Sequence, residues 1–461
     1  MGWVPGDRDI EWDHGACGWE YAPVSEIIDD LTWRGLIAVS TDLDDLRKGL
    51  AAGPITYYGG FDPTAPGLHI GNLVLLLTMR RLQQAGHRPI GLVGGATGLI
   101  GDPSGKSAER TLNPRDVVAA WVERIRAEVG RFLDFNPGPT GAIAVSNLDW
   151  TSQLSAIDFL RDIGKHFPVN QMLSREVVKT RLEQGGISYT EFSYQILQAN
   201  DFLELHQRYG CDLQLGGSDQ WGNLVSGVDL IRRVTGDSVH ALATPLITKP
   251  DGTKYGKSEG GAIWLSPELM SPYAFYQFWL NRSDAEVPGL LRVFTFLGRD
   301  EIEHLEAETA ERPAARVGQR RLADEVTTLV HGAAETAKAV AAGQALFGQG
   351  DLRELDEGTL ASALAEVPRA EVDKADLARA GTSSEPDGGT GLATVADLMA
   401  ACGIAPSKSA ARRAIQEGGA YLNNVKVGSV EASPSEADLL HGRYLVLRRG
   451  KRTVGGIEVR A

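Results

Sequence analysis

The stretch that decides the fold is residues 54–73, PITYYGGFDPTAPGLHIGNL. Its β-branched and aromatic run at 55–58 predicts a short strand. The Gly, Pro and Asp residues of 59–67 are typical of a turn, and the apolar spacing that starts at Leu68 predicts a helix. A helix that begins directly after a strand and turn presents free backbone N–H groups to an anion. The stretch therefore predicts a phosphate site, although an ordinary βα unit would have the same spacing.

Within this stretch, FDPTAPGLHIGN at 61–72 resembles the first signature of class I aminoacyl-tRNA synthetases, in the version of their bacterial tyrosyl branch. The usual signature ends in His, whereas this one ends in Asn72, which can donate a hydrogen bond but cannot be protonated. A second string, TKPDGTKYGKSEGG at 248–261, resembles the second class I signature, with Tyr255 at the usual Met position. GDPSGK at 101–106 and GGSDQ at 216–220 also resemble strings of this family.

Length and composition predict a soluble, multidomain protein. The chain has 461 residues, enough for two to four domains, and 43% hydrophobic residues. It contains no apolar run of membrane-spanning length and no signal-like N-terminus. Three widely separated cysteines argue for a reducing compartment and against a disulfide framework or a Cys-based metal site. We expect a cytoplasmic protein.

Strands alternate with helices through the first half of the chain, which predicts a doubly wound parallel α/β sheet of the Rossmann type. A buried strand is expected at 88–93, and helices at 28–50, 70–86, 153–166 and 171–184. The expected domains are an N-terminal extension (1–27), a Rossmann-type catalytic domain (28–262), an all-helical domain (263–367), a linker (368–391) and a small α+β RNA-binding domain (392–461).

The charge is unevenly distributed along the chain. The net charge is −14, but residues 392–461 contain ten Lys and Arg against six Asp and Glu, a net of +4 that leaves −18 for the remainder. An acidic body with a basic terminal domain indicates a polyanionic partner. SKSAARRAIQEGGAYLNNVKV at 407–427 resembles the RNA-binding domain shared with the fourth protein of the small ribosomal subunit. The resemblance assigns tRNA contacts to Lys408, Arg412 and Arg413.

The loop at 94–107 contains Gly105-Lys106-Ser107 and could be mistaken for an ATP-binding P-loop. A P-loop needs a glycine five positions before the glycine of the Gly-Lys pair, and Ile100 occupies that position before Gly105. The sequence therefore argues against a P-loop kinase or NTPase.

The resemblance to class I synthetases assigns phosphate chemistry to the two signatures. Adenylate formation expels pyrophosphate, so cationic and N–H donors that meet the developing charge stabilise the transition state. The catalytic residues implied are Thr64, His69, Asn72, Lys254 and Lys257. The implied ATP and adenylate contacts are Gly60, Asp62, Gly71, Gly217, Asp219, Gln220 and Lys257. Mg²⁺ is expected on the ATP phosphates, with no tightly bound metal in the protein.

The resemblance also implies a tyrosine site. Tyr58 and Asp201 would bind the phenol hydroxyl, and Asp102, Tyr194 and Gln198 the ammonium group. The spacing supports this assignment independently, because Tyr194, Gln198 and Asp201 at i, i+4 and i+7 share one face of a helix. Without the motifs, these three residues would be assigned to the core and surface of an ordinary helix.

The expected activity is that of a tyrosine–tRNA ligase, with L-tyrosine, ATP and tRNA(Tyr) as substrates and a homodimer carried over from the family. Three alternatives remain at this stage. The first is a tryptophanyl relative, against which Tyr58 and Asp201 argue. The second is an RNA-binding protein that has lost catalysis, favoured only by Asn72. The third is a generic nucleotide-binding protein, distinguished by whether tRNA binding needs residues 392–461.

Overall fold

The computed structural model of the chain describes residues 26–104, 112–248, 261–378 and 394–460. It divides into two compact units, the first formed by Met1–Leu269 with Arg282–Leu322 and the second by Met270–Asn281 with Ala323–Ala461. The N-terminal extension predicted at 1–27 falls almost wholly outside the described residues. None of the helices within the described ranges is both long and apolar enough to cross a membrane.

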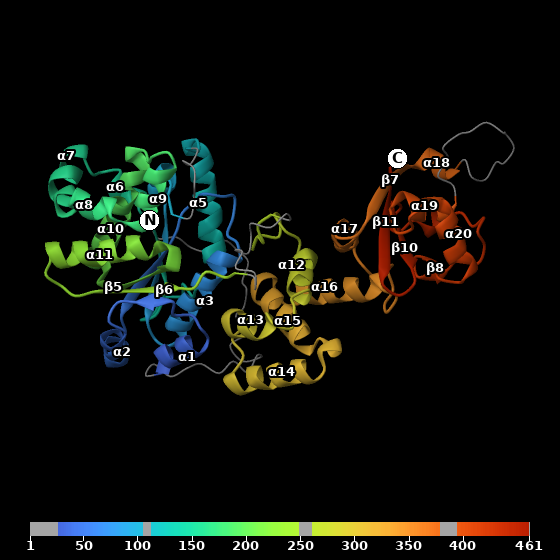
Figure 1. Cartoon of the computed structure of the whole chain (residues 1–461), viewed down its shortest axis with the longest axis horizontal. Coiled ribbons are helices and arrows are strands. Elements are labelled where there is room, and N and C mark those ends of the chain that lie inside the picture. The colour runs from blue at the N-terminus through green and yellow to red at the C-terminus, as the bar shows by residue number, and fades with distance from the viewer. Residues whose placement is uncertain (1–25, 105–111, 249–260, 379–393, 461) are drawn as a thin grey trace. The chain divides into compact units, whose positions relative to one another are not determined.

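The first unit is built on a six-stranded sheet in the order β1-β6-β5-β2-β3-β4 (Figure 1). The strands are β1 (Val39–Ser40), β2 (Thr56–Phe61), β3 (Arg88–Val93), β4 (Ile143–Ser146), β5 (Cys211–Gly217) and β6 (His240–Thr244). β2 to β6 pair in parallel, and β1 is an antiparallel edge strand on β6. This confirms the predicted doubly wound sheet, whose strand order reverses between β2 and β5.

Consecutive tyrosines on β2 show how the two faces of the sheet are covered. The Tyr57 hydroxyl donates to the carbonyl of Met79 on α3 (Ile70–Gln84), whereas the Tyr58 ring lies 5.4 Å from Phe202 on α10 (Tyr189–Tyr209). Side chains alternate between the faces of a strand, so α3 and α10 cover opposite faces. α5 (Arg115–Val129) packs on β3, and α11 (Trp221–Val234) packs on α10, β5 and β6.

Three helix predictions differ from the structure: two of the predicted helices are divided, and the third is helical but mixed in type. The helix expected at 28–50 is two helices, α1 (Ile27–Trp33) and α2 (Leu43–Ala52), because the chain turns at Gly35 (φ 72°) and then adds β1. The helix expected at 153–166 is a short α7 (Ala156–Asp158) followed by a π-helical turn and a 3₁₀ turn. The helix expected at 171–184 is divided into α8 (Val169–Leu173) and α9 (Glu176–Gln184). Two further short helices are α4 (Thr97–Ile100) and α6 (Leu148–Thr151).

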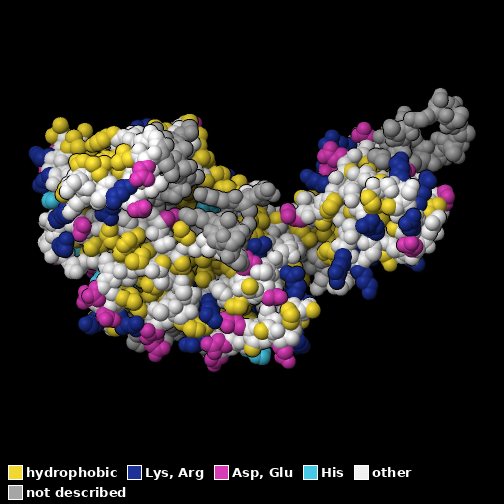
Figure 2. Space-filling model, in the orientation of Figure 1, with side chains coloured by type: hydrophobic (Ala, Val, Ile, Leu, Met, Phe, Trp, Pro, Cys, Tyr) yellow, Lys and Arg dark blue, Asp and Glu magenta, His cyan; other side chains and the backbone are white. Residues whose placement is uncertain are grey.

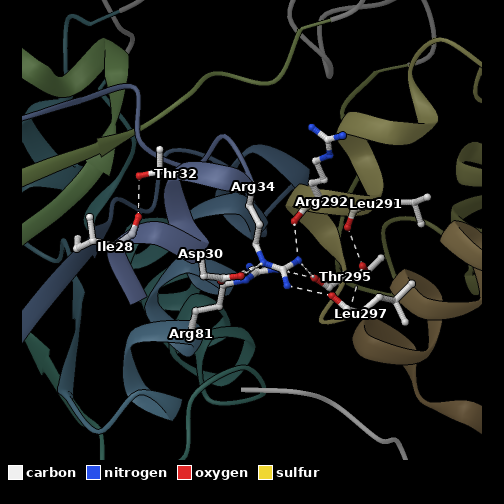
Figure 3. A network of polar contacts seen from close by, with 9 residues as sticks. All are labelled: Ile28, Asp30, Thr32, Arg34, Arg81, Leu291, Arg292, Thr295 and Leu297. Carbon is white, nitrogen blue, oxygen red and sulfur yellow. Dashed lines mark hydrogen bonds and ion pairs between the residues drawn. The ribbon is translucent and has the colours of Figure 1, made fainter. Parts of the chain in front are cut away.

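Two buried arginines tie α1 and α3 to the connection between α13 (Val287–Phe294) and α14 (Arg299–Glu311) (Figure 3). Arg34 pairs with Asp30 at 2.9 Å and donates to the carbonyls of Arg292, Thr295 and Leu297. Arg81, in the last turn of α3, donates to the same Thr295 carbonyl at 2.5 Å. Burial and the neighbouring Arg34 lower the pKa of Arg81 to about 9. The carbonyls at the end of α13 and in the following connection thus accept hydrogen bonds from two buried guanidinium groups.

The second unit begins with helices and ends in a small α+β domain. Its helices include α12 (Pro272–Leu280), α16 (Ala333–Leu346) and α17 (Glu357–Ala365), and α15 (Val317–His331) crosses the division between the units. The predicted linker at 368–391 was wrong in its first part, because Arg369–Asp373 form β7, which pairs in parallel with β11, and Lys374–Ala378 form α18. The pattern of charged residues in this strand concealed it, since only Val372 is buried.

The terminal domain has a five-stranded sheet in the order β7-β11-β10-β8-β9. The strands after β7 are β8 (Ala420–Leu422), β9 (Val425–Lys426), β10 (Tyr444–Arg449) and β11 (Thr453–Arg460). Two helices, α19 (Val395–Ala401) and α20 (Lys408–Gln416), pack together and share a hydrophobic core with the sheet. The predicted small α+β domain is therefore confirmed as a fold.

Candidate active site

Most of the described candidate residues of the active site lie at the carboxyl ends of β2, β3 and β5 or on α10. Gly60 and Asp62 belong to the end of β2, and Gly217 ends β5. Asp219 and Gln220 follow in a 3₁₀ turn that leads into α11. Because the strand order reverses between β2 and β5, this edge is where an open α/β sheet forms a binding crevice.

Tyr58 and Asp201 form the buried end of the site. Both side chains are 1% exposed, and the Tyr58 hydroxyl has no hydrogen-bond partner. Burial raises the pKa of Tyr58 well above its usual value, and the nearby Asp201 carboxyl raises it further. A buried hydroxyl without a partner is costly, so its presence beside a carboxyl group indicates a place for a polar atom of a ligand.

Two neutral donors hold the Asp201 carboxyl group. Asn147 Nδ2 donates to Oδ2 at 2.9 Å, and Trp150 Nε1 donates to Oδ1 at 2.8 Å. Burial nevertheless raises the pKa of Asp201 to about 8, because the loss of solvation outweighs these two hydrogen bonds. The carboxyl group is therefore fixed in position without a cationic partner.

A chain of hydrogen bonds connects Asp201 to the first signature. Asn147 Nδ2 also lies 2.9 Å from Thr97 Oγ1, which donates to Asp62 Oδ1 at 2.6 Å. The other Asp62 oxygen accepts from the Tyr194 hydroxyl at 2.6 Å. Gly94 permits this arrangement, since a Cβ there would lie 1.9 Å from Asp62 Oδ1. Asp62 is thus held by residues from the loop after β3 and from α10.

Asp102 and Gln220, which come from different loops, meet in the structure. Gln220 Nε2 donates to Asp102 Oδ2 at 2.5 Å, and the Ser104 amide donates to Asp102 Oδ1 at 3.0 Å. Gln198 on α10 has a buried Oε1 with no partner. An unsatisfied amide oxygen in a site that also contains carboxylates suits a cationic ligand group.

His69 and Asn72 form the capped N-terminus of α3. His69 Nδ1 accepts from the Gly71 amide at 3.1 Å, and Asn72 Oδ1 accepts from the His69 amide at 3.1 Å. Burial lowers the pKa of His69, which favours the neutral ring. Because Nδ1 accepts, the proton of that ring is on Nε2. The cap therefore directs the donor groups, Nε2–H and the Asn72 Nδ2 amide, away from the helix backbone. Thr64 lies in the preceding loop, where its amide donates to the Asp62 carbonyl.

The structure adds three residues that the sequence analysis missed: Thr97, Asn147 and Trp150. Asn147 follows β4 directly, so its position at the carboxyl end of a parallel strand was a usable signal. Trp150 would be read from the sequence as an ordinary core residue, and its contribution to the site comes from one polar atom, the Nε1 that donates to Asp201. Lys254 and Lys257, predicted to be catalytic, lie outside the described residues.

The candidate RNA-contacting residues lie on α20 of the terminal domain. Arg412 and Arg413 are exposed, whereas Ala411, Ala414 and Ile415 are buried. Lys408 at the start of the helix pairs with Asp397 at 2.8 Å. The two arginines are therefore presented on the solvent side of a helix whose other side is packed.

Comparisons with known proteins agree with this geometry. Residues 50–348 match the model of the family "tRNA synthetases class I (W and Y)", and residues 388–454 match the "Tyrosine--tRNA ligase SYY-like C-terminal domain". A curated "Tyrosine--tRNA ligase" of Streptomyces avermitilis is 62% identical over 438 residues, which cover 95% of this chain and 99% of the relative. A curated "Tyrosine--tRNA ligase" of Thermobifida fusca is 58% identical over 446 residues, which cover 95% of this chain and 100% of the relative.

Among solved structures, a C-terminally truncated Aspergillus nidulans mitochondrial tyrosyl-tRNA synthetase is similar, with a TM-score of 0.63 and 29% identity. The match covers 68% of this chain and 92% of that one. The fold and the edge of the sheet described above are thus those of a class I aminoacyl-tRNA synthetase. Within that class, the chain belongs to the tyrosine–tRNA ligase family.

Proposed function

We propose that the chain activates L-tyrosine with ATP, giving tyrosyl-adenylate and pyrophosphate, and then transfers the tyrosyl group to the 3′ end of tRNA(Tyr). This two-step reaction is that of the family to which the chain belongs. It needs no covalent bond to the protein, so binding, orientation and charge stabilisation are the tasks of the side chains.

The observation that carries the proposal is the unpartnered Tyr58 hydroxyl beside Asp201. The phenol hydroxyl of a bound tyrosine would reach both groups and satisfy the buried oxygen of Tyr58. Phenylalanine would fill the same space but leave these polar groups without a partner, and this is the basis of discrimination. Asn147 and Trp150 keep Asp201 in position for that contact.

The ammonium group of tyrosine would be bound by Tyr194, Gln198 and Asp102. Gln198 Oε1 is buried and without a partner, and it can accept from an ammonium donor. Asp102 adds negative charge and is held by Gln220. The Tyr194 hydroxyl oxygen is fixed by its bond to Asp62. With its ammonium group and phenol both held, the tyrosine carboxylate would be directed towards ATP.

In the first step, the carboxylate oxygen attacks the α-phosphorus as the bond to the pyrophosphate oxygen breaks. His69 Nε2–H and the Asn72 side-chain amide, both at the N-terminus of α3, would donate to phosphate oxygens. Lys254 and Lys257 would take the pyrophosphate charge. Thr64 adds a donor, and Gly60, Gly71, Gly217 and Asp219 would line the nucleotide, with Asp219 suited to a ribose hydroxyl.

Mg²⁺ would bind the phosphates of ATP rather than a site made of protein groups alone. The Asp62 carboxylate already accepts from Tyr194 and Thr97, and that of Asp102 accepts from Gln220 and Ser104. Mg²⁺ commonly retains waters and binds to substrate phosphates, where it neutralises charge. The donor groups present therefore suit a metal that arrives with the nucleotide.

The terminal domain would bind tRNA through α20. Arg412 and Arg413 lie on its exposed side, where guanidinium groups can reach the phosphate backbone. Lys408 begins the same helix. Because its ammonium group is paired with Asp397, we expect it to contribute less to tRNA binding than the two arginines.

We further propose that the chain is a cytoplasmic homodimer, formed through an apolar area of the first unit. Large hydrophobic side chains are exposed around α6, α7, α8 and α9, and Figure 2 shows hydrophobic side chains gathered on this part of the surface. They include Leu148 (41%), Ile157 (70%), Leu160 (53%), Val169 (59%), Leu173 (41%) and Tyr189 (68%). Contiguous exposed apolar patches mark protein interfaces, and a second copy is the partner the family implies.

The experiment that tests this function is amino-acid-dependent ATP–pyrophosphate exchange with tyrosine, phenylalanine and tryptophan measured side by side. We expect exchange with tyrosine alone. Exchange with tryptophan instead would favour the tryptophanyl alternative, and folded protein without any exchange would favour an RNA-binding protein without catalysis.

A further inference from the structure

Glu128, on the last turn of α5, reaches the first signature although the two are 60 residues apart in the chain. Its Oε2 accepts a hydrogen bond from the Leu68 amide at 2.6 Å, directly before His69. Gly67 allows this approach, since a Cβ there would lie 2.9 Å from Glu128 Oε1 and 2.9 Å from a Leu269 methyl carbon. The carboxyl group therefore lies against the backbone that presents His69.

The backbone immediately after this amide is held by a second segment of the chain, residues 263–265. The Leu68 carbonyl accepts from the Leu265 amide at 2.9 Å, and the Ile70 amide donates to the Ile263 carbonyl at 3.0 Å. His69 and Trp264 form the antiparallel bridge between these two contacts. Glu128 thus completes the hydrogen bonding of the backbone from which α3 starts, in addition to the cap made by His69 and Asn72.

The surroundings of Glu128 are unusual for a structural carboxyl group. The residue is 5% exposed and its Oε1 has no partner. Arg124 and Arg131 favour its ionised form, Glu268 opposes it, and Arg124 also donates to the Pro66 carbonyl at 3.0 Å. Burial dominates and raises the pKa of Glu128 to about 7. The group that holds Leu68 therefore titrates in the range where the enzyme is assayed.

We propose that Glu128 is a positioning residue for adenylate formation: its carboxylate holds the Leu68 peptide and so places His69 and the N-terminus of α3 against the phosphates of ATP. The inference rests on the function proposed above. An ionised carboxylate is a stronger acceptor than the protonated acid, so the peptide is held most firmly when Glu128 is charged. Misplacing a donor that acts in the transition state lowers kcat more than it weakens tyrosine binding.

The test compares the wild-type protein with Glu128→Ala and Glu128→Gln in tyrosine-dependent ATP–pyrophosphate exchange between about pH 6 and 9. The matched control is Glu123→Gln, an exposed glutamate of the same helix that pairs with Arg126. We expect Glu128→Ala to lower kcat by about 10–100-fold with little change in the KM for tyrosine, the loss typical of a hydrogen bond to a charged group. Glu128→Gln, which keeps an acceptor, should recover most of kcat.

The pH profile separates positioning from a purely structural role. The wild type should lose kcat as the pH falls through the pKa of Glu128, and Glu128→Gln should lack that inflection. An unchanged kcat in Glu128→Ala would overturn the inference, and so would the same inflection in wild type and Glu128→Gln. If Glu128→Ala does not fold, the test rests on the pH profiles of kcat for the wild type and Glu128→Gln. Failure of the wild type to exchange would contradict the proposed function instead.

Discussion

The hydroxyl of Tyr194 lies 2.6 Å from Asp62 Oδ2, and this contact joins α10, the helix that carries three of the proposed tyrosine-binding residues, to the first signature, 132 residues earlier in the chain. Asp62 takes its second hydrogen bond from Thr97, which Asn147 connects to Asp201. Tyr194, assigned to the ammonium group of tyrosine, and Asp201, assigned to its hydroxyl, are therefore parts of one hydrogen-bond network. We therefore expect a substitution at either end of the network to weaken the binding of tyrosine.

Tyr194→Phe should weaken tyrosine binding without unfolding the protein. The substitution removes only the hydroxyl group, which donates a hydrogen bond to Asp62. A hydrogen bond to a charged group contributes about 1.5–3 kcal/mol, which corresponds to roughly 10–100-fold in kcat/KM. The measurement is kcat/KM for tyrosine in ATP–pyrophosphate exchange. Tyr209→Phe, at the partly exposed end of the same helix, is the control and should leave kcat/KM unchanged. Equal values for both variants would remove Tyr194 from the site.

Arg34→Ala should destabilise the first unit. It would leave Asp30 without its ion pair and the carbonyls of Arg292 and Leu297 without this donor, whereas the Thr295 carbonyl would keep its bond from Arg81 (Figure 3). Breaking a fully buried ion pair costs about 3–5 kcal/mol of unfolding free energy, and because the Asp30 side chain is 21% exposed we expect a loss at the lower end of this range. Arg47→Ala removes an exposed pair with Asp29 and should cost no more than about 1 kcal/mol. Denaturant unfolding of the two variants would contradict this account if they were destabilised equally.

Glu128 should make the stability of the protein depend on pH. Its pKa is raised from 4.5 to about 7 in the folded state, so between these values the folded protein binds the proton more tightly than the unfolded chain. The contribution is therefore most favourable below about pH 4.5 and is lost as the pH rises through about 7, with an upper limit of about 3 kcal/mol.

Glu128→Gln removes this dependence, and the comparison of the two proteins isolates it. We expect the variant to gain stability over wild type at pH 8 and to gain much less at pH 5, measured by denaturant unfolding. Glu123→Gln should show no such difference between the two pH values. A gain for Glu128→Gln that is independent of pH would mean that ionisation of Glu128 is not its source.

Reversing two charges on α20 should separate tRNA binding from amino-acid activation. Arg412→Glu with Arg413→Glu changes the exposed side of the helix and leaves its packed side, Ala411 and Ile415, intact. We expect a raised KM for tRNA and a salt dependence whose log–log slope falls by about one unit for each phosphate group that the helix no longer binds. ATP–pyrophosphate exchange should be unaffected. Lys451→Glu, in the exposed β10–β11 turn, is the control for a general effect of charge.

Much of the site was predictable because its residues occur in contiguous strings. Asp62, His69 and Asn72 share one signature, and Tyr194 and Asp201 share one helix face, so a local pattern locates each group. Asn147 and Glu128 were not predicted because each acts through hydrogen bonds to residues at least 50 positions away in the chain. Their own neighbourhoods look like an ordinary loop and an ordinary amphipathic helix.

The fold, like the site, was predictable where it depends on local sequence patterns and not where it depends on contacts between distant segments. The alternation of strands and helices predicted the parallel sheet, because that pattern is a property of successive segments. The helix break at Gly35 and the strand β7 were not foreseen, because both depend on pairing with distant segments. β1 pairs with β6, some 200 residues later, and β7 pairs with β11, so neither strand is identified by its own two to five residues.

The central claim is that the unpartnered Tyr58 hydroxyl helps to recognise the hydroxyl of tyrosine, and Tyr58→Phe tests it most directly. The measurement is the ratio of kcat/KM for tyrosine to that for phenylalanine in ATP–pyrophosphate exchange. Tyr57→Phe is the matched control, since the neighbouring hydroxyl points to Met79 on the opposite face of the sheet. The account predicts that Tyr58→Phe lowers the ratio by about 10–100-fold and that Tyr57→Phe leaves it unchanged. A ratio in Tyr58→Phe equal to that of the wild type would contradict it.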